Sequence, residues 1–252
     1  MTEQVPKTML ITGASRGIGA ATARLAAGAG YAVCVNYASN ADAARAVVDD
    51  ITSAGGRAFA HQADVAKSAD VTAMFEAVDA ELGALGVLIN NAGILETRCR
   101  SDEISADRLA RVLAVNVSGA FLCAQAAIKR MSRDLGGQGG SIVNVSSRAA
   151  VLGAAQEYVD YAASKGAVDS MTIGMAMEFA EHGVRINAVR PGLIETDIHA
   201  SGGMPDRVEK FAYKVPMQRG GTADEVAEAI LWLASDASRY TTGAFIEVSG
   251  GR

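Results

Sequence analysis

Short apolar runs alternate along the chain with longer, alanine-rich stretches in which apolar residues recur at helical spacing. The apolar runs have the length of strands that are buried on both faces. Strands are expected over residues 8–11, 32–36, 58–62, 87–90, 142–145, 185–189 and 244–248. Helices are expected over residues 18–27, 41–54, 71–82, 107–135, 161–181 and 223–234. This alternation predicts an α/β fold, a doubly wound, seven-stranded parallel sheet with helices on both faces and right-handed crossovers.

Length, composition and charge narrow the class of protein. The 252 residues are 50% hydrophobic, which is enough to bury one large core, so residues 1–252 are expected to form a single domain. The net charge of −5 at pH 7 disfavours nucleic acid or an anionic membrane as a partner. No apolar run reaches the roughly 20 residues that cross a bilayer. The polar residues 1–7 lack the apolar core of a secretory signal, and a cytoplasmic protein is therefore expected.

A glycine-rich turn, residues 12–19 (TGASRGIG), follows the first expected strand and leads into the first expected helix. Strand, glycine turn and helix in this order are typical of a phosphate-binding site, because the helix N-terminus offers free N–H groups. Gly13 permits a tight turn, Gly17 lets the backbone approach a pyrophosphate, and Gly19 lets the helix pack closely on the sheet. A loop that needs glycine only to turn sharply is the alternative interpretation.

Tyr161 and Lys165 are four residues apart in an expected helix, so both side chains lie on one face. An ordinary tyrosine has a pKa of about 10 and transfers protons poorly near neutrality. A nearby ammonium stabilises the phenolate and lowers the pKa of the phenol. By itself the pair is weak evidence, because this spacing occurs by chance on many amphipathic helices.

Six motifs occur in one order along the chain, at residues 12–19, 90–93, 116, 146–147, 161–165 and 191–192. With these motifs the chain resembles the short-chain dehydrogenase/reductase family, in its NADP-preferring type, over nearly its whole length. The resemblance implies a Rossmann-type fold. It also implies an NAD(P)-dependent oxidoreductase that interconverts a carbonyl and a secondary alcohol by hydride transfer.

The resemblance implies four catalytic residues, Asn116, Ser147, Tyr161 and Lys165. Ser147 would orient the carbonyl oxygen and Tyr161 would protonate the forming alkoxide. Lys165 would hold the nicotinamide ribose and keep the tyrosine pKa low, while Asn116 would hold a water that resupplies the proton. The spacing from Ser147 to Tyr161 is one residue longer than is common in the family, so Ser146 stays open as the alternative serine. Tyr158 is not a candidate, because the residue four positions after it is an alanine.

NADP(H) is favoured over NAD(H) as the cofactor. A carboxylate at the end of the second strand would bind an adenosine 2′-hydroxyl and repel a 2′-phosphate. This chain has Asn36-Tyr-Ala-Ser39-Asn40 there, without a carboxylate. Arg16 in the glycine turn could pair with the phosphate, and Ser39 and Asn40 could donate hydrogen bonds to it. A solvated turn residue is the alternative for Arg16.

The expected cofactor-binding residues come from the ends of successive strands. Asp64 and Val65 resemble the pair that contacts the adenine ring, although Asp64 could equally cap the next loop. Asn90 can also tie neighbouring strands together. The full set is Gly13, Ser15, Arg16, Gly17, Ile18, Gly19, Asn36, Ser39, Asp64, Val65, Asn90, Ala92, Gly93, Tyr161, Lys165, Pro191, Gly192 and Thr196.

Substrate choice is expected to lie in three irregular stretches, at about residues 94–106, 148–160 and 193–219, because open α/β sheets bind ligands at the carboxyl ends of their strands. His199 is the only histidine near them. A small or medium carbonyl compound is the favoured substrate. A 3-oxoacyl thioester on acyl carrier protein, with Lys129, Arg130 and Arg133 as the docking cations, and a glucose-type sugar are the alternatives. Two non-enzymatic functions are also kept as alternatives: an NADPH-sensing binding protein and a mainly structural subunit.

The cysteines do not suggest a metal or redox site. Cys34 and Cys123 are expected in the core, and Cys99 lies in a polar stretch with nothing near it that would lower its pKa. The apolar ends of helices 107–135 and 161–181, together with residues 242–248, resemble the surfaces through which the family forms tetramers. A homotetramer is therefore expected.

Overall fold

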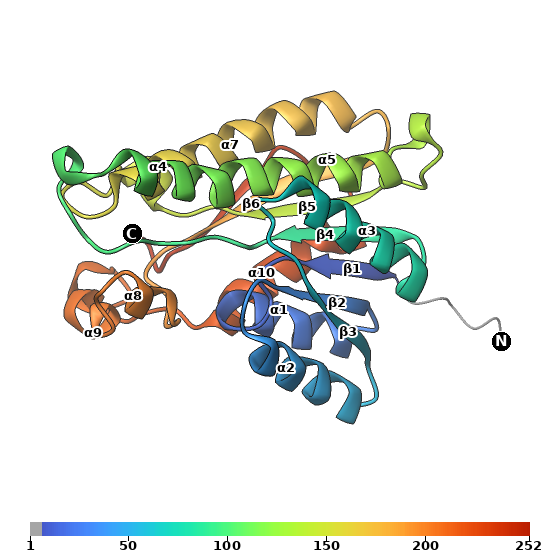
Figure 1. Cartoon of the computed structure of the whole chain (residues 1–252), viewed down its shortest axis with the longest axis horizontal. Helices are drawn as coiled ribbons and strands as arrows, with labels where there is room; N and C mark the ends of the chain where they lie inside the picture. Colours follow the sequence, from blue (N-terminus) through green and yellow to red (C-terminus); the bar gives the residue numbers. More distant parts are fainter. Residues whose placement is uncertain (1–6) are drawn as a thin grey trace.

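The computed structural model describes residues 7–252, so the polar start of the chain lies, except for Lys7, outside the described residues. Seven strands form one parallel sheet in the order β3-β2-β1-β4-β5-β6-β7, with the crossover between its halves at β1 and β4 (Figure 1). The predicted fold class is confirmed. The strands are β1 (Thr8–Ile11), β2 (Ala32–Tyr37), β3 (Arg57–Gln62), β4 (Leu85–Asn90), β5 (Gly140–Val145), β6 (Val184–Pro191) and β7 (Phe245–Val248).

The longer helices form two layers, with α1, α2 and α10 on one face of the sheet and α3, α5 and α7 on the other (Figure 1). The helices are α1 (Gly17–Gly28), α2 (Ala41–Ser53), α3 (Ser68–Leu82), α4 (Ala106–Leu113), α5 (Ala120–Met131), α6 (Ala149–Leu152), α7 (Val159–Phe179), α8 (Ile198–Ser201), α9 (Arg207–Phe211) and α10 (Ala223–Ala234). Short 3-10 turns are η1 (Ser101–Glu103), η3 (Arg133–Leu135), η4 (Ala212–Lys214) and η5 (Asp236–Ser238).

The strands β1, β2, β4, β5 and β6 are largely buried on both faces, as their apolar composition predicts, while the edge strands β3 and β7 are only partly buried. In β1, Leu10 packs into one layer while Met9 and Ile11 pack into the other, because successive side chains of a strand point to opposite faces. Cys34 and Cys123 are fully buried in the first of these layers, which confirms their expected core role. Burial also raises the pKa of the Cys123 thiol to about 12.

The helix expected over residues 107–135 is not uniform. A π-helical segment, η2 (Ala114–Gly119), separates α4 from α5, and α5 ends at Met131. Asn116 lies inside this segment, and its amide bonds to the backbone of Ile94 and to Ser164 on α7. Because these bonds turn a polar side chain toward the interior, they account for the irregular turn at this place.

The continuous helical stretch Ala106–Met131 has 26 residues and a mean hydropathy of 1.5 in its most apolar window. By length and mean composition alone it could cross a membrane, although it contains no uninterrupted apolar run of that length, since Asp107, Arg108 and Arg111 lie in it. Its apolarity has another cause, because 44% of that window is buried inside the protein, where Cys123, Ala127 and Met131 pack against the sheet.

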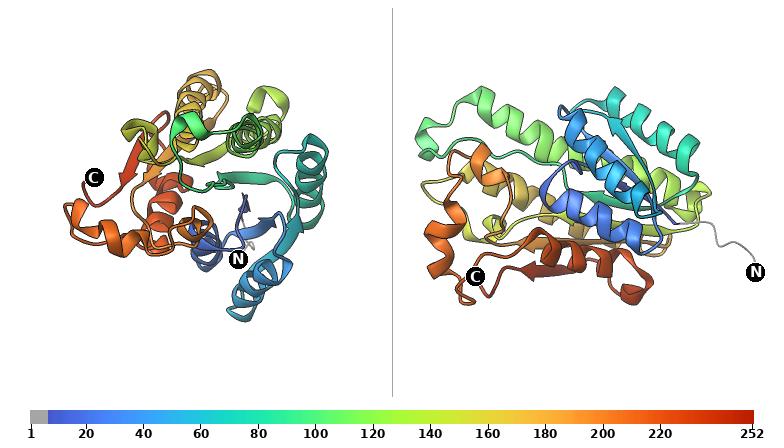
Figure 2. Two further views of the ribbon diagram at one scale, coloured as in Figure 1. Left: turned by 60° about the vertical axis from the view of Figure 1, so that its left-hand side comes forward. Right: turned by 90° about the horizontal axis from the view of Figure 1, so that it is seen from below.

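Three short helices, α6, α8 and α9, lie in stretches that were expected to be irregular. They are four or five residues long, which is too short for a helical period to emerge from the sequence. They gather beyond the carboxyl ends of the strands, near the C-terminus and far from the N-terminal end of the described chain (Figures 1 and 2). The fold therefore brings the three expected substrate stretches to the edge of the sheet where the glycine turn also lies.

Phe121, Ile173 and Met177 are exposed apolar side chains on α5 and α7. These helices belong to the surface that the family resemblance connects with assembly. The homotetramer stays a prediction.

Candidate active site

A cleft of about 560 Å³ opens at the carboxyl end of the sheet. The glycine turn, the ends of β2 and β4 to β6, the start of α7 and the segment around α8 line it. All the expected catalytic and cofactor-binding residues line this cleft except Gly19, Asn90 and Asn116. Residues that are far apart in sequence, such as Arg16 and Thr196, are thus parts of one cavity.

The glycine turn has the backbone that its composition predicts. Gly13 and Gly17 have φ angles of +61° and +54°, in the left-handed region that favours glycine. A Cβ on Gly13 would lie 2.9 Å from the Cα of Ala92, and one on Gly19 would lie 2.6 Å from the Gly13 carbonyl oxygen. Side chains at these positions would push the turn away from the end of β4.

Helix α1 begins directly at the turn and points its N-terminus into the cleft. Its N-cap residue, Arg16, makes no side-chain capping bond. The first N–H groups of α1 are therefore available to an anion, and the helix dipole favours one there. Asn91 fixes the turn by donating to the carbonyl oxygens of Thr12, at 2.8 Å, and Gly13, at 2.9 Å.

Asn36 and Asn90 use their amides inside the protein. Asn36 accepts a hydrogen bond from the Gly13 N–H at 3.1 Å and donates to the Ala63 carbonyl at 3.1 Å, which joins the turn to β2 and β3. Asn90 donates to Asn144 and to the Ala120 carbonyl, both at 3.0 Å, and so ties β4 to β5 and α5. Both residues shape the cleft, and their polar groups are already engaged.

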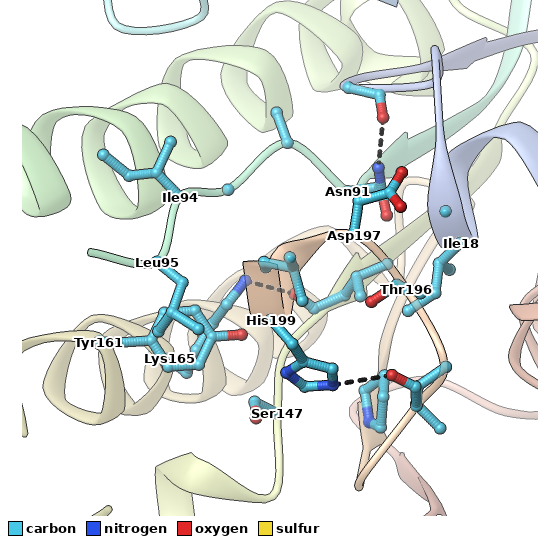
Figure 3. Close-up of a pocket in the computed structure, with 18 of the residues that line it drawn as sticks. Ile18, Asn91, Ile94, Leu95, Ser147, Tyr161, Lys165, Thr196, Asp197 and His199 are labelled. Carbon is cyan, nitrogen blue, oxygen red and sulfur yellow. Dashed lines mark hydrogen bonds between the residues drawn. The ribbon is translucent and has the colours of Figure 1, made fainter. Parts of the chain in front are cut away.

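Tyr161 and Lys165 come from the first turns of α7 and enter the cleft side by side (Figure 3). The Lys165 Nζ donates to the Val145 carbonyl at 2.7 Å and lies 5.6 Å from the centroid of the Tyr161 ring. A Cβ on Gly93 would lie 3.5 Å from that Nζ and 3.4 Å from the Asn116 Oδ1. The lack of a side chain at Gly93 therefore lets the loop after β4 approach both polar groups.

Asn116 lies behind this group and does not line the cleft. Its Oδ1 accepts from the Ile94 N–H at 2.8 Å, and its Nδ2 donates to the Ile94 carbonyl at 3.0 Å and to the Ser164 Oγ at 3.1 Å. These bonds hold the start of the loop 94–106 and connect it to α7. The water relay through Asn116 stays a prediction.

The two neighbouring serines have different surroundings. The Ser147 hydroxyl lies near enough to Tyr161 to lower the pKa of the phenol, and the Ser147 Oγ accepts from the Ala149 N–H at 3.1 Å. Ser146 is 2% exposed and donates at 2.5 Å to the Asp169 carboxylate. Because the Ser146 hydroxyl is committed to Asp169, the geometry favours Ser147 as the serine that meets a substrate.

Burial dominates the electrostatics of the pair, and the expectation that Lys165 keeps the tyrosine pKa low stays a prediction. Burial raises the pKa of Tyr161 to about 12, and the Ser147 hydroxyl offsets only part of this effect. Burial also lowers the pKa of Lys165 to about 8, while Asp169 acts in the opposite direction. The ammonium lies over the ring face and is bonded to Val145, so desolvation dominates at both groups.

Several lining residues carried no signal in the sequence. Tyr158 donates to the Gly202 carbonyl at 3.2 Å, and Arg207 pairs with Glu157 at 2.5 Å, so these contacts join the second and third substrate stretches. Arg98 joins the first stretch to the third through its N–H, which donates to the Gly202 carbonyl at 3.4 Å. Only the packing of α8 and α9 over the cleft brings these residues together.

Asp64 and Thr196, two of the expected cofactor-binding residues, lie at the edges of the site. Asp64 lines the cleft, and its Oδ1 also accepts from the Ala66 N–H at 3.0 Å, so it caps its own loop. Thr196 faces Gly17 at close range, since a Cβ built on Gly17 would lie 3.4 Å from the Thr196 Cγ2. Within residues 7–252, no group of His, Cys, Asp and Glu side chains is arranged to hold a metal ion.

Comparison with known proteins agrees with this arrangement. Residues 13–252 match the family described as enoyl-(acyl carrier protein) reductase. The chain belongs to the short-chain dehydrogenase/reductase family. This short-chain dehydrogenase/reductase is 55% identical over 243 residues to the uncharacterized oxidoreductase YgfF of Escherichia coli, covering 96% of this chain and 98% of that protein. It is 38% identical over 251 residues to the 3-oxoacyl-[acyl-carrier-protein] reductase FabG of Staphylococcus aureus, covering 98% of each chain.

Solved structures of the family share the fold. A short-chain type dehydrogenase/reductase from Mycobacterium marinum superposes with a TM-score of 0.91 at 36% identity, over 98% of this chain and 96% of that one. The expected enzyme class is confirmed: the short-chain dehydrogenase/reductase is an oxidoreductase acting on CH–OH groups.

Proposed function

We propose that this enzyme is an NADPH-dependent reductase of small or medium carbonyl compounds that uses Tyr161 as the general acid. The observation that carries the proposal is the meeting of Ser147, Tyr161 and Lys165 in one cleft with the open N-terminus of α1. A binding protein that only senses NADPH has no chemical need for such a group of residues.

The residues around the turn fit a dinucleotide. The uncapped first turn of α1 offers N–H donors to a pyrophosphate, and Gly17 leaves the cleft open toward Thr196. Pro191, Gly192 and Thr196 line the opposite wall, where a nicotinamide would lie against them. When it is bound, NADPH supplies the hydride.

The chain's own residues supply the proton and the orientation. Ser147 would donate to the carbonyl oxygen of the substrate and hold it beside Tyr161. The raised pKa of Tyr161 keeps the phenol protonated at neutral pH, so it can protonate the oxygen as negative charge develops there. The charged form of Lys165, close to the ring, would stabilise the phenolate that this transfer leaves.

The preference for NADP(H) rests on the charges near the end of β2. Arg16 is exposed and lines the cleft, and its guanidinium makes no hydrogen bond or ion pair with the other described residues. Ser39 is also exposed on the cleft rim, and Asn40 caps α2 through its Oδ1, which leaves its Nδ2 free to donate. No carboxylate at this strand end opposes a 2′-phosphate.

Replacing Arg16 with alanine should raise KM for NADPH about tenfold to a hundredfold, because one charge-assisted contact to phosphate is lost. KM for NADH should change little, since NADH has no phosphate at that position. Steady-state kinetics with both cofactors measure this. Arg24→Ala is the matched control, because Arg24 lies on the same helix but pairs with Asp50 outside the cleft. If the native enzyme uses NADH better than NADPH, and Arg16→Ala does not change this, the proposed preference for NADP(H) is contradicted.

The pKa of Lys165 predicts the pH dependence of reduction. The lysine is charged below its pKa of about 8 and loses its charge as the pH rises through that value. Carbonyl reduction should therefore decline above pH 8, while Tyr161 is still protonated. Asp169→Asn should move the decline to lower pH, because Asp169 favours the charged lysine. Turnover that stays constant well above pH 8 would contradict this role for Lys165.

The structure does not favour the carrier-protein alternative. Lys129, Arg130 and Arg133, the candidate docking cations, lie at the end of α5 and just after it. Arg133 lines a second cavity with Ser141 and Arg185, near the amino ends of β5 and β6 and thus at the edge opposite the cleft. Arg130 is paired with Asp79. Arg130 and Arg133 are therefore not placed to dock a carrier protein at the active-site rim, although a 3-oxoacyl thioester belongs in any substrate test because of the similarity to FabG.

A further inference from the structure

His199 in α8 is a buried histidine on the wall of the cleft, and the proposed mechanism does not use it. It is 9% exposed, and its Nε2 lies 2.8 Å from the carbonyl oxygen of Ile194. A carbonyl oxygen only accepts, so the Nε2 must carry the hydrogen in this contact. In a neutral imidazole the Nδ1 is then unprotonated and can only accept a hydrogen bond.

This Nδ1 is buried and has no hydrogen-bond partner within the described protein. Figure 3 shows the imidazole with one nitrogen turned toward Ile194 and the other on the side of Ser147 and Tyr161. Buried acceptors without partners are rare because they cost free energy, so this one calls for an explanation, such as a role in binding or catalysis.

The surroundings of His199 keep it neutral. Burial and the positive charge of Arg207 lower its pKa, although the bond to Ile194 acts in the opposite direction. The Arg207 guanidinium lies between the rings of Tyr158 and Phe211, 5.2 and 5.3 Å from their centroids, and pairs with Glu157. Its Nη1 is likewise buried without a partner. This end of the cleft therefore has an unsatisfied acceptor beside an unsatisfied donor, which is a poor environment for a purely aliphatic chain.

We propose that His199 is a specificity-determining residue whose Nδ1 accepts a hydrogen bond from a hydroxyl group of the substrate. The inference rests on the proposed function and deepens it by naming the substrate class as hydroxylated carbonyl compounds, such as hydroxyketones. A site that binds a substrate hydroxyl rejects the analogue that lacks it more strongly than an apolar pocket rejects an added group.

The test uses hydroxyketones whose hydroxyl stands at increasing distances from the carbonyl, each beside the ketone with a methyl group in place of that hydroxyl. The ratio of kcat/KM within each pair is measured with NADPH. The native enzyme should prefer one hydroxyketone over its methyl partner by about tenfold or more. Equal use of both members of every pair would overturn the inference and leave the proposed function standing. A native enzyme that reduces none of the ketones would overturn the proposed function, and the inference with it.

Two variants separate recognition of the hydroxyl from a structural role of the imidazole. His199→Gln can keep a donor to Ile194 but has no acceptor at the Nδ1 position, so the preference should disappear. His199→Asn can place its Oδ1 near the Nδ1 position while losing the bond to Ile194, so it should restore most of the preference. His182→Gln, at a histidine that does not line the cleft, should keep the native ratio. If Gln keeps the native ratio, or if both variants lower kcat/KM for the two members of a pair equally, His199 is only structural and the inference fails.

Discussion

Replacing Tyr161 with phenylalanine is expected to lower kcat for carbonyl reduction by about 10² to 10⁴, the range that a positioned general acid contributes. The ring that packs in the cleft is kept and only the hydroxyl is lost. Because the pKa of Tyr161 is raised to about 12, the native hydroxyl is a proton donor throughout the neutral range.

The readouts for Tyr161→Phe are initial rates of ketone-dependent NADPH oxidation and the affinity for NADPH in a fluorescence titration. The affinity should remain close to native, so that the loss is one of chemistry. Tyr158→Phe is the matched control: it removes the bond to Gly202 from another tyrosine of the same cleft and should reduce turnover much less. A Tyr161→Phe enzyme with near-native kcat would exclude the phenol as the acid.

Alanine replacements at the two neighbouring serines are expected to give opposite results. Ser147→Ala removes the hydroxyl that meets Tyr161 and should lower kcat by about 10² to 10³, as the loss of one oxyanion donor does, with little change in stability. Ser146→Ala removes a buried hydrogen bond to Asp169 and should lower the free energy of unfolding by about 1–3 kcal/mol, with a much smaller effect on kcat.

Denaturant unfolding and steady-state kinetics on both serine variants measure these effects. Asp169 keeps its ion pair with Arg190 at 2.9 Å in either variant, which limits the damage at Ser146. A large loss of turnover in Ser146→Ala with an active Ser147→Ala would reverse the assignment in favour of Ser146.

Most of the fold could be predicted because its signals are local. The inner strands of the sheet are short apolar runs buried on both faces, and the turn before α1 needs glycine for positive φ angles. The interruption of the long helix by η2 could not be derived from periodicity, because it depends on bonds from Asn116 to Ile94 and Ser164, which are distant in sequence. Helices α8 and α9 are too short to give a periodic signal.

The positions of the candidate site residues could be predicted from motifs at strand ends, since parallel strands bring their carboxyl ends to one edge. The pKa values of these residues could not be predicted in the same way. Spacing places Lys165 beside Tyr161, but the extent of burial decides both pKa values. Likewise, the sequence carries no signal for Arg207 or the free Nδ1 of His199, because both depend on how α8 and α9 pack over the cleft.

The most direct test of the central claim is the initial rate of NADPH oxidation by the native enzyme with a panel of simple ketones, hydroxyketones, diketones and aldehydes. An acetoacetyl thioester completes the panel, and NADH is tested in parallel. The account predicts turnover of ketones that is faster with NADPH than with NADH and faster than that of the thioester. Rapid reduction of the thioester without reduction of the free ketones would contradict the proposed substrate class. If neither cofactor is oxidised with any carbonyl compound, the proposed reaction itself is contradicted.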